Sequence, residues 1–278
     1  MAFDNIAGVY KFIINSFDAQ LGNSDINLPP ISFPSKHTHT YIHMDQLTFY
    51  IIFHKTIFPE NTPSFPCFTY MAANEFISKD IDIHKLKHTI VNEFDTPGYN
   101  PLYQMLNFCD NSVILNYPSP PTPYIGLCQY DMYIDSDKFK LVFNILTGNN
   151  NIIGFYPYSV NTILDILSES QWNEILSSYN SKNNTYHSIQ SLQVCPFFLM
   201  NAYIIPSWFY TKLQSTAKTM LPLVFKFLKY DMRHIAGTLE RLNSLIIACA
   251  IHENVLKYHI SDAVIDNRSQ TIPDSIRH

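Results

Sequence analysis

The sequence predicts an α/β domain whose mixed, mostly parallel sheet is flanked by helices. Short runs rich in β-branched and aromatic residues alternate with segments of helical periodicity, which is the order typical of such folds. Two of these runs, residues 47–53 (LTFYIIF) and 124–130 (YIGLCQY), have the continuous apolar character of buried strands. The longest helix is expected to open at Pro206 and to end near residue 228, because proline suits a first helical turn.

The other expected elements continue this alternation. They are a strand at 67–72, a helix at 102–108, helices that begin at Ser159 and Gln171, a strand at 197–205, a helix from about 238 to 250 after Gly237, and a final strand at 255–260. Residues 1–45 contain Pro29, Pro30 and Pro34, which break regular structure. We therefore expect an N-terminal extension at 1–45 and one domain at 46–278.

Composition restricts the classes of protein that the chain can represent. Hydrophobic residues make up 46% and aromatic residues 14% of its 278 residues, which is ample for a packed core. The net charge of −5 argues against a general nucleic-acid binder, whose phosphate contacts need a cationic surface. No apolar run reaches the ~18 residues of a membrane-spanning helix, and the N-terminus lacks a signal-peptide pattern. We expect a soluble protein without a membrane span.

The five cysteines favour a reducing compartment. Their number is odd, none forms a C-x-x-C pair, and four of them lie in apolar runs. Buried reduced thiols are therefore the expected state, and the cytoplasm is the expected location.

Polar residues follow two of the expected strands, at the edge where open α/β sheets bind ligands. His54 and Lys55 come directly after the first strand, and Asp131, Asp135 and Asp137 follow the central strand in QYDMYIDSD. One or two carboxylates, with phosphate oxygens and water, can hold a divalent cation on a diphosphate. Taken alone, three nearby acids more often form a solvated turn. The chain has only seven glycines and no glycine-rich phosphate loop.

Three segments resemble a group of GT-A-like glycosyltransferases found in bacteria and large DNA viruses. LTFYIIFHKTIFPEN is similar to the opening strand and His-Lys pair of that group, and PYIGLCQYDMYID is similar to its central strand. FFLMNAYIIPSWFY, followed by RHIAGTLERL, is similar to its Asn-containing strand, long helix and Glu-Arg-Leu helix. The segments follow one another in the order of the group. One departure is that many relatives carry an Arg pair where this chain has Asp131 and Met132.

The resemblance implies a GT-A-like (Rossmann-like) fold and the transfer of a hexosyl or deoxyhexosyl group. The donor would be a nucleotide-diphosphate sugar and the acceptor a hydroxyl of a glycan. The resemblance also implies that Asp131 binds the donor and a Mn²⁺ or Mg²⁺ ion, with Asp135 as a second metal ligand. An Arg pair could replace the metal as the counter-charge of the diphosphate, whereas Asp131 would recruit one. His54, Lys55 and Asn201 are the further expected donor contacts.

A catalytic carboxylate is also implied by the resemblance, near the start of a late helix and after a loop that contains a glycine. Gly237 and Glu240 fit this description. Glu240 is therefore expected to deprotonate the acceptor hydroxyl as a general base in an inverting displacement. The alternative is an acid that is favoured by the helix dipole and paired with Arg241.

Two other functions are compatible with the sequence. A nucleotidyltransferase would also place a metal and a nucleotide on an α/β sheet, but the glycine-rich loop and basic signature of such enzymes are absent from this sequence. A non-catalytic module that binds a carbohydrate or a nucleotide sugar would explain a metal motif with only one aspartate, Asp131, in the best position.

Overall fold

The computed structural model describes only part of the chain, namely residues 44–53, 57–73, 89–91, 110–146, 150–228 and 234–266. All of them belong to the second of the two units into which the chain divides, Ile42–His278. The expected N-terminal extension, the expected helix at 102–108, and His54 and Lys55 lie outside the described residues. The domain boundary after residue 45 stays a prediction.

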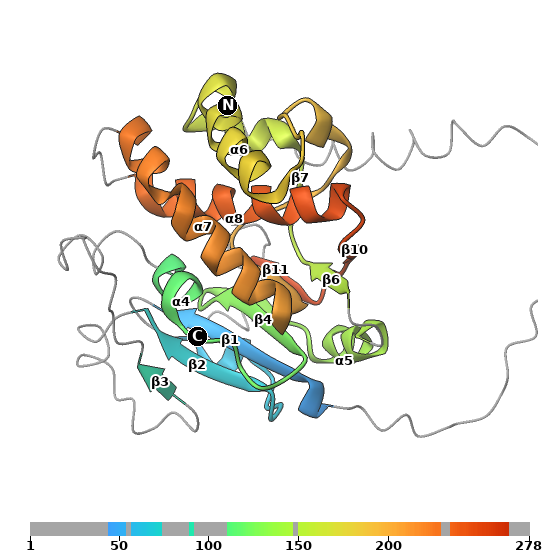
Figure 1. Ribbon diagram of the computed structural model, residues 1–278. Coiled ribbons are helices and arrows are strands. Elements are labelled where there is room, and N and C mark those ends of the chain that lie inside the picture. Colours follow the sequence, from blue (N-terminus) through green and yellow to red (C-terminus); the bar gives the residue numbers. More distant parts are fainter. Residues whose placement is uncertain are drawn as a thin grey trace, which may run out of the picture. The chain divides into compact units, whose positions relative to one another are not determined.

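The main sheet has seven strands in the order β10-β6-β9-β4-β1-β2-β3 (Figure 1). The strands are β1 (Leu47–Phe53), β2 (Phe68–Ala72), β3 (Thr89–Val91), β4 (Tyr124–Gln129), β6 (Asn151–Gly154), β9 (Tyr203–Pro206) and β10 (Lys257–Ile260). Strands β3, β2, β1 and β4 are parallel neighbours, and β6 is parallel to β10. Strand β9 is antiparallel to both β4 and β6. The predicted α/β fold with a mostly parallel sheet is confirmed.

Two short antiparallel strand pairs and several helices complete the described structure. The strand pairs are β5 (Met132–Ile134) with β11 (Val264–Asp266) and β7 (Pro157–Tyr158) with β8 (Phe197–Phe198). The α-helices are α4 (Asn111–Asn116), α5 (Ser136–Ile145), α6 (Glu169–Asn183), α7 (Ser207–Leu228) and α8 (Ile235–His252), and the 3-10 helices are η1 (Met44–Gln46), η2 (Pro59–Asn61), η4 (Val160–Asp165) and η5 (Ser191–Val194). None of the helices described is long and apolar enough to cross a membrane.

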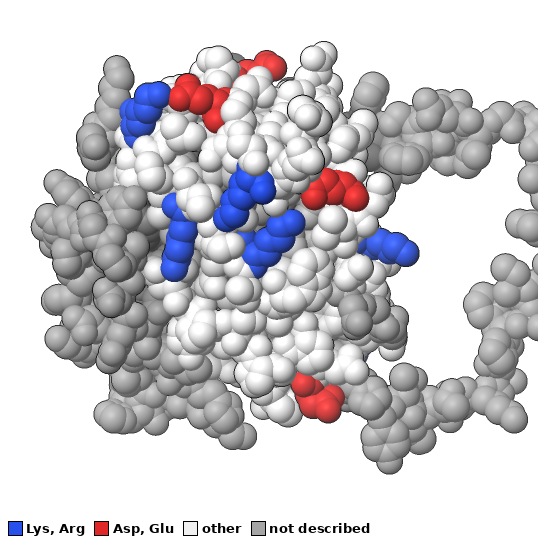
Figure 2. Space-filling model, viewed as in Figure 1, with Lys and Arg blue, Asp and Glu red and all other residues white. Residues whose placement is uncertain are grey.

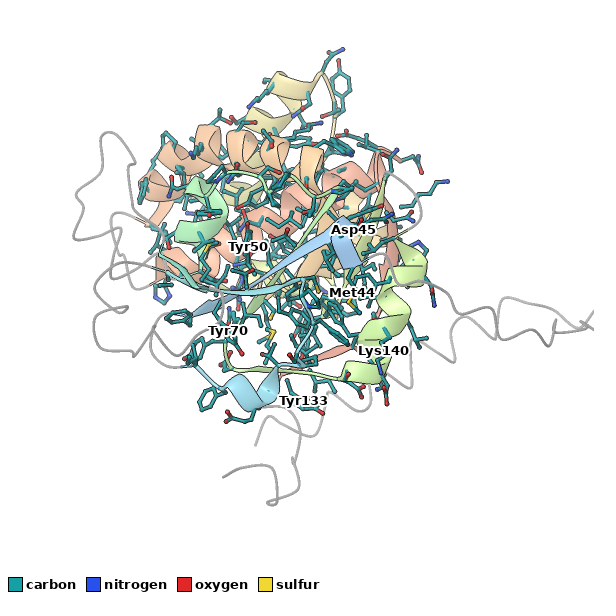
Figure 3. All side chains as sticks on the ribbon, turned by 90° about the horizontal axis from the view of Figure 1, so that it is seen from below. Met44, Asp45, Tyr50, Tyr70, Tyr133 and Lys140 are labelled. Carbon is teal, nitrogen blue, oxygen red and sulfur yellow. The ribbon has the colours of Figure 1, made fainter. Side chains whose placement is uncertain are left out.

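Both faces of the sheet are covered, which explains why its central strands are apolar along their whole length. On one face, Tyr50 and Ile52 of β1 pack into a cluster with residues of α4, α6, α7 and α8. On the other face, Phe49 and Ile51 pack with residues of α5, β5 and β11. Tyr50 and Tyr70, which are labelled in Figure 3, therefore belong to opposite faces of the sheet. Strands buried on both sides carry the continuous apolar runs from which they were predicted.

Charged side chains are sparse on the surface as well as in the sequence. On the face drawn in Figure 2, residues of both signs are scattered over a largely uncharged surface. This distribution agrees with a charged fraction of 15%, where about a quarter is usual for a soluble domain.

The cysteines of the described residues are buried and unpaired, as expected from the sequence. They are Cys67, Cys128, Cys195 and Cys249. Burial raises the pKa of the Cys67 thiol to about 12 and also raises that of Cys249. These thiols therefore stay protonated at neutral pH and act as small apolar side chains.

The strand expected at 197–205 is in fact two strands, β8 and β9. Met200 and Asn201, which lie between them, have φ values of 61° and 47°. These values belong to the left-handed region, which an extended strand cannot contain. The prediction of one strand was wrong because apolar character alone does not reveal a turn that lacks glycine and proline.

Two helix predictions also need correction. The helix expected from Ser159 is the 3-10 helix η4, in which the backbone N–H of Thr162 donates to the carbonyl of Ser159. The last long helix begins at Ile235, so that Gly237 lies inside α8 and not in a loop before it. Glu240 is consequently in the second turn of this helix, one turn later than expected.

Gly126 in β4 is required by the packing of the neighbouring strand. A Cβ atom on Gly126 would lie 2.1 Å from Cδ2 of Phe49, far inside van der Waals contact. Phe49 is fully buried, and its ring centroid lies 5.3 Å from those of both Phe68 and Phe139 and 6.3 Å from that of Phe155. Because these rings hold Phe49 in place, β4 can approach it only with a glycine at this position.

Gly126→Ala should lower the free energy of unfolding by about 1–3 kcal/mol, the usual cost of overpacking a core. Urea unfolding followed by circular dichroism measures this change. Gly237→Ala in α8 is a matched control, because its Cβ would meet only the side-chain ends of Arg241 and Ile166, both at 3.2 Å. Alanine is also the better helix former by ~1 kcal/mol, so the control should be neutral or stabilising. A Gly126→Ala protein as stable as the wild type would contradict the packing argument.

Candidate functional site

The reversed direction of β9 brings its first residues to the carboxyl end of the parallel strands. Strands β4 and β9 pair with Leu127 opposite Tyr203. Gln129, the last residue of β4, therefore lies beside Asn201, which comes shortly before β9. Open α/β sheets bind their ligands outside the carboxyl ends of the strands. This edge of the sheet is the candidate site.

Five polar side chains form one hydrogen-bonded group at this edge, which we call the Asp110 cluster: Asp110, Asn111, Gln129, Asn201 and Asn243. Oδ2 of Asp110 accepts hydrogen bonds from Asn201 Nδ2 at 2.6 Å and from Gln129 Nε2 at 3.4 Å. Nδ2 of Asn243 donates to Oδ1 of Asn111 at 3.0 Å and to Oδ1 of Asn201 at 3.1 Å. The cluster thus joins the start of α4, the end of β4, the approach to β9 and the middle of α8.

Asp110 is a buried acid whose partners are neutral amides. Asp110 is only 5% exposed, and its carboxylate accepts hydrogen bonds from the side chains of Asn201 and Gln129. Burial raises the pKa of the Asp110 carboxyl to about 6, and the bonds from the two amides oppose the rise. A carboxyl that titrates this close to neutral pH at the ligand-binding edge of a sheet is a candidate functional group.

Glu240 reaches the same place from α8. Its Oε1 accepts a hydrogen bond of 2.5 Å from the backbone N–H of Met200. Asp110 and Glu240 therefore bind adjacent residues, Asn201 and Met200, of the turn that precedes β9. We call it the 200–201 turn. The structure thus brings together two of the expected site residues, Glu240 and Asn201.

Arg241, the alternative partner considered for Glu240, makes a two-point ion pair with Asp165. Its Nε and Nη2 atoms lie 2.8 and 2.7 Å from the two carboxylate oxygens of Asp165. Its Nη1 atom donates to the carbonyl of Gly237 at 2.9 Å. The guanidinium therefore ties α8 to η4.

Asp131 lies in the two-residue turn between β4 and β5 and is partly buried. The pKa of the Cys128 thiol is raised by burial and, to a lesser degree, by the charge of Asp131, which places this carboxylate near the end of β4. Asp131 therefore occupies the expected place at a strand's carboxyl end. In the described ranges, no group of three or more His, Cys, Asp and Glu side chains could hold a metal ion. The role of Asp131 as a metal ligand stays a prediction.

Asp135, the second expected metal ligand, is the N-cap of α5. Its Oδ1 accepts hydrogen bonds from the backbone N–H groups of Asp137 at 3.0 Å and Lys138 at 3.1 Å. This capping gives Asp135 a structural role that needs no metal. Its assignment to a metal site, like the donor contacts expected of His54 and Lys55, stays a prediction.

Most of the Asp110 cluster was missed by sequence analysis. Asp110 and Asn111 directly precede the run SVIL, and this pattern is typical of the start of a helix, so it could have drawn attention to them. Asn243 is one of several polar residues of α8, and the sequence of a helix does not reveal the partner of any one of them. The decisive contacts join residues that are 91 positions apart (Asp110 and Asn201) and 132 positions apart (Asn111 and Asn243).

Comparison with known proteins finds similar structures but no similar sequence. No protein-family model matches the chain, and no curated protein matches it significantly. The apo structure of WbbM, a bifunctional glycosyltransferase, is similar with a TM-score of 0.51 and 11% identity, over 79% of this chain and 45% of WbbM. The apo structure of mouse xyloside xylosyltransferase 1 aligns with a TM-score of 0.40 and 10% identity, over 77% of this chain and 84% of that one.

The likeness to WbbM concerns the fold. This chain spans less than half the length of WbbM, and at 11% identity the alignment shows a shared architecture and no more. The chain therefore has the α/β fold of a glycosyltransferase structure, as the resemblance of its motifs implied. The particular family that the motifs suggested stays a prediction.

Asp110→Asn should stabilise the protein above about pH 7 and change its stability little near about pH 4. The carboxyl has a pKa of about 6 in the folded state and the ordinary value of 3.8 when unfolded. Between these values the folded state binds more protons, so the wild type loses stability as the pH rises through this window. The shift corresponds to roughly 3 kcal/mol at about 1.4 kcal/mol per pKa unit. Denaturant unfolding of both proteins across this pH range measures the difference.

Asp137→Asn is the control for this experiment. Asp137 is exposed, and its pKa is lowered by the nearby ammonium group of Lys140. Its replacement should change stability little and should not produce a gain that grows with pH. An Asp110→Asn protein that is less stable than the wild type at neutral pH would contradict the assignment of Asp110 as a buried charge.

Proposed function

We propose that this protein is a glycosyltransferase that moves a hexosyl or deoxyhexosyl group from a nucleotide-diphosphate sugar to a hydroxyl of a glycan acceptor. One observation carries the proposal. Polar side chains from the start of α4, the end of β4, the turn before β9 and the middle of α8 meet at the carboxyl end of the sheet, in a domain whose fold is that of a glycosyltransferase structure. Nucleotides bind at this position in open α/β sheets.

Asp131 is the residue that we propose for the diphosphate of the donor. A Mn²⁺ or Mg²⁺ ion fits a single carboxylate when phosphate oxygens and water complete its shell, so Asp131 can serve although Asp135 is engaged as a cap. Such an ion would stabilise the charge that develops on the leaving diphosphate. His54 and Lys55 are the other donor contacts that we propose. A donor contact of Asn201 stays a prediction, because Asn201 is buried and both polar atoms of its amide are hydrogen-bonded within the Asp110 cluster.

Glu240 is the proposed general base. A base must be oriented as well as placed within reach of the proton that it removes, and the backbone N–H of Met200 supplies an orienting bond to Oε1. Glu240 takes the proton of the acceptor hydroxyl while that oxygen bonds to the anomeric carbon of the donor sugar. The bond from this carbon to the diphosphate breaks on the opposite side, so the product has inverted configuration.

Asp131→Asn should abolish the metal-dependent part of donor binding and leave the fold intact, because the amide keeps the shape of the side chain but not its charge. A thermal-shift screen of nucleotide sugars, with and without Mn²⁺, measures this effect. A ligand at ~100 times its dissociation constant stabilises by roughly 2.7 kcal/mol, which is readily visible. Asp262→Asn, which replaces an exposed acid that pairs with Lys138, is the matched control and should behave as the wild type.

Donor affinity and a Mn²⁺ dependence that both survive Asp131→Asn would remove Asp131 from the donor site. The same screen distinguishes the alternative functions. Slow hydrolysis of a nucleotide sugar in the presence of metal supports the enzyme. Sugar binding without metal dependence and without hydrolysis would instead indicate a non-catalytic carbohydrate-binding module.

Glu240→Gln should slow turnover by roughly 10²–10⁴-fold, the typical contribution of a general base. Donor binding should barely change, because the base meets the acceptor and not the nucleotide. Turnover with saturating acceptor and donor affinity by calorimetry are the two measurements. Glu174→Gln is the control, since Glu174 is exposed and pairs with Lys226 on the surface. Near-normal turnover of Glu240→Gln would leave Glu240 with the structural role of binding the Met200 N–H.

A further inference from the structure

The 200–201 turn is held by two carboxylates that come from different parts of the chain. Oε1 of Glu240 accepts the backbone N–H of Met200 at 2.5 Å, and Oδ2 of Asp110 accepts Nδ2 of Asn201 at 2.6 Å. The turn is left-handed at both residues. Asparagine tolerates this conformation, whereas it is unfavourable for Met200 and persists there only where the surroundings hold it. A shift of Asn201 also displaces the adjacent residue Met200, whose backbone N–H donates the hydrogen bond to Glu240.

The amide of Asn201 can make its bond to Asp110 in one orientation only. Asn243 donates to Oδ1 of Asn201 at 3.1 Å, so Nδ2 of Asn201 is directed to Asp110. Asn243 is itself fixed, because the same Nδ2 donates to Asn111 at 3.0 Å. All four residues are buried, so solvent does not compete for these bonds. These hydrogen bonds therefore connect α4 and α8 to the 200–201 turn and restrict the movement of the Asn201 side chain.

We propose that Asp110 is a positioning residue that fixes the 200–201 turn and thereby sets the direction of the Glu240 carboxylate. The proposal rests on the proposed function, in which Glu240 is the general base. Asp110 is buried and acts through Asn201 and Met200, so it need not touch the substrate. An asparagine at position 110 would fill the same space without the cost of a buried charge, so the presence of a carboxylate needs a reason. The charge gives a shorter and stronger bond to Asn201, which is what a positioning residue requires.

Hydrogen exchange and transfer kinetics of Asp110→Ala test the proposal. The Met200 amide should exchange faster than in the wild type, because Asn201 loses the shortest of its side-chain hydrogen bonds and keeps only those with Asn111 at 3.2 Å and Asn243 at 3.1 Å. The value of kcat should fall by roughly 10²-fold, the effect expected of a misplaced catalytic group, while donor affinity stays unchanged. Asp110→Asn keeps an oxygen that can accept from Asn201, so it should recover part of both losses.

Asp165→Asn is the matched control. It is the same substitution as Asp110→Asn, and it disturbs Arg241, the residue next to Glu240, without touching the 200–201 turn. It should leave both Met200 exchange and kcat unchanged. Unchanged exchange of the Met200 amide in Asp110→Ala would overturn the proposal, and so would faster exchange with an unchanged kcat.

Amide exchange needs no substrate, so it separates this proposal from the proposed function. A wild type that transfers sugar from none of the tested donors would overturn the proposed function, and Met200 exchange would still decide whether Asp110 holds the turn. Should Asp110→Ala fail to fold, Asn201→Ala removes the donor of the same bond and should produce the same two changes. Normal Met200 exchange in both Asn201→Ala and Asp110→Asn would then overturn the proposal.

Discussion

Strand β9 is inserted between β4 and β6 against their direction, and the candidate site depends on the hydrogen bonds that hold it there. Because of this reversal, the residues before β9 lie at the same edge as the residues that follow β4. A parallel strand of the same four residues would carry Asn201 to the opposite edge of the sheet, about 13 Å away at ~3.3 Å per residue. The chain must also turn sharply to enter β9, and it does so in the left-handed conformation of Met200 and Asn201.

This turn explains why polar groups are buried beside an otherwise apolar core. The side-chain amide of Asn201 needs protein partners, because Asn201 is only 1% exposed and water cannot supply them. The helices α4 and α8 place Asp110 and Glu240 at the required points. The raised pKa of Asp110 reflects the unfavourable burial of its charge. Functional sites are where proteins commonly retain such unfavourable groups.

This chain shares its fold with WbbM, but function has to be argued from the residues of the candidate site. A parallel sheet with helices on both faces directs any ligand to the carboxyl edge. At that edge lie one aspartate in the turn after β4, a glutamate on α8 and a buried acid bound by amides. Within the Asp110 cluster, the amides of Asn111 and Asn201 each have both their oxygen and their nitrogen hydrogen-bonded, which fixes their orientation.

The sequence by itself determined the central strands β1 and β4, because strands buried on both faces are apolar throughout. It also predicted that the helix α7 ends near residue 228, whereas Pro206, which was expected in its first turn, is the last residue of β9 and directly precedes the helix. It also indicated Asp131 at a strand end, and its motif resemblance pointed to Asn201 and Glu240. The tertiary structure alone decided the order of the strands, the direction of β9 and the break before it. It also decided the partners of Asp110, since residues 91 positions apart become neighbours only when the whole sheet is assembled. Local patterns report burial and turns, whereas a site made of distant segments is specified by their packing.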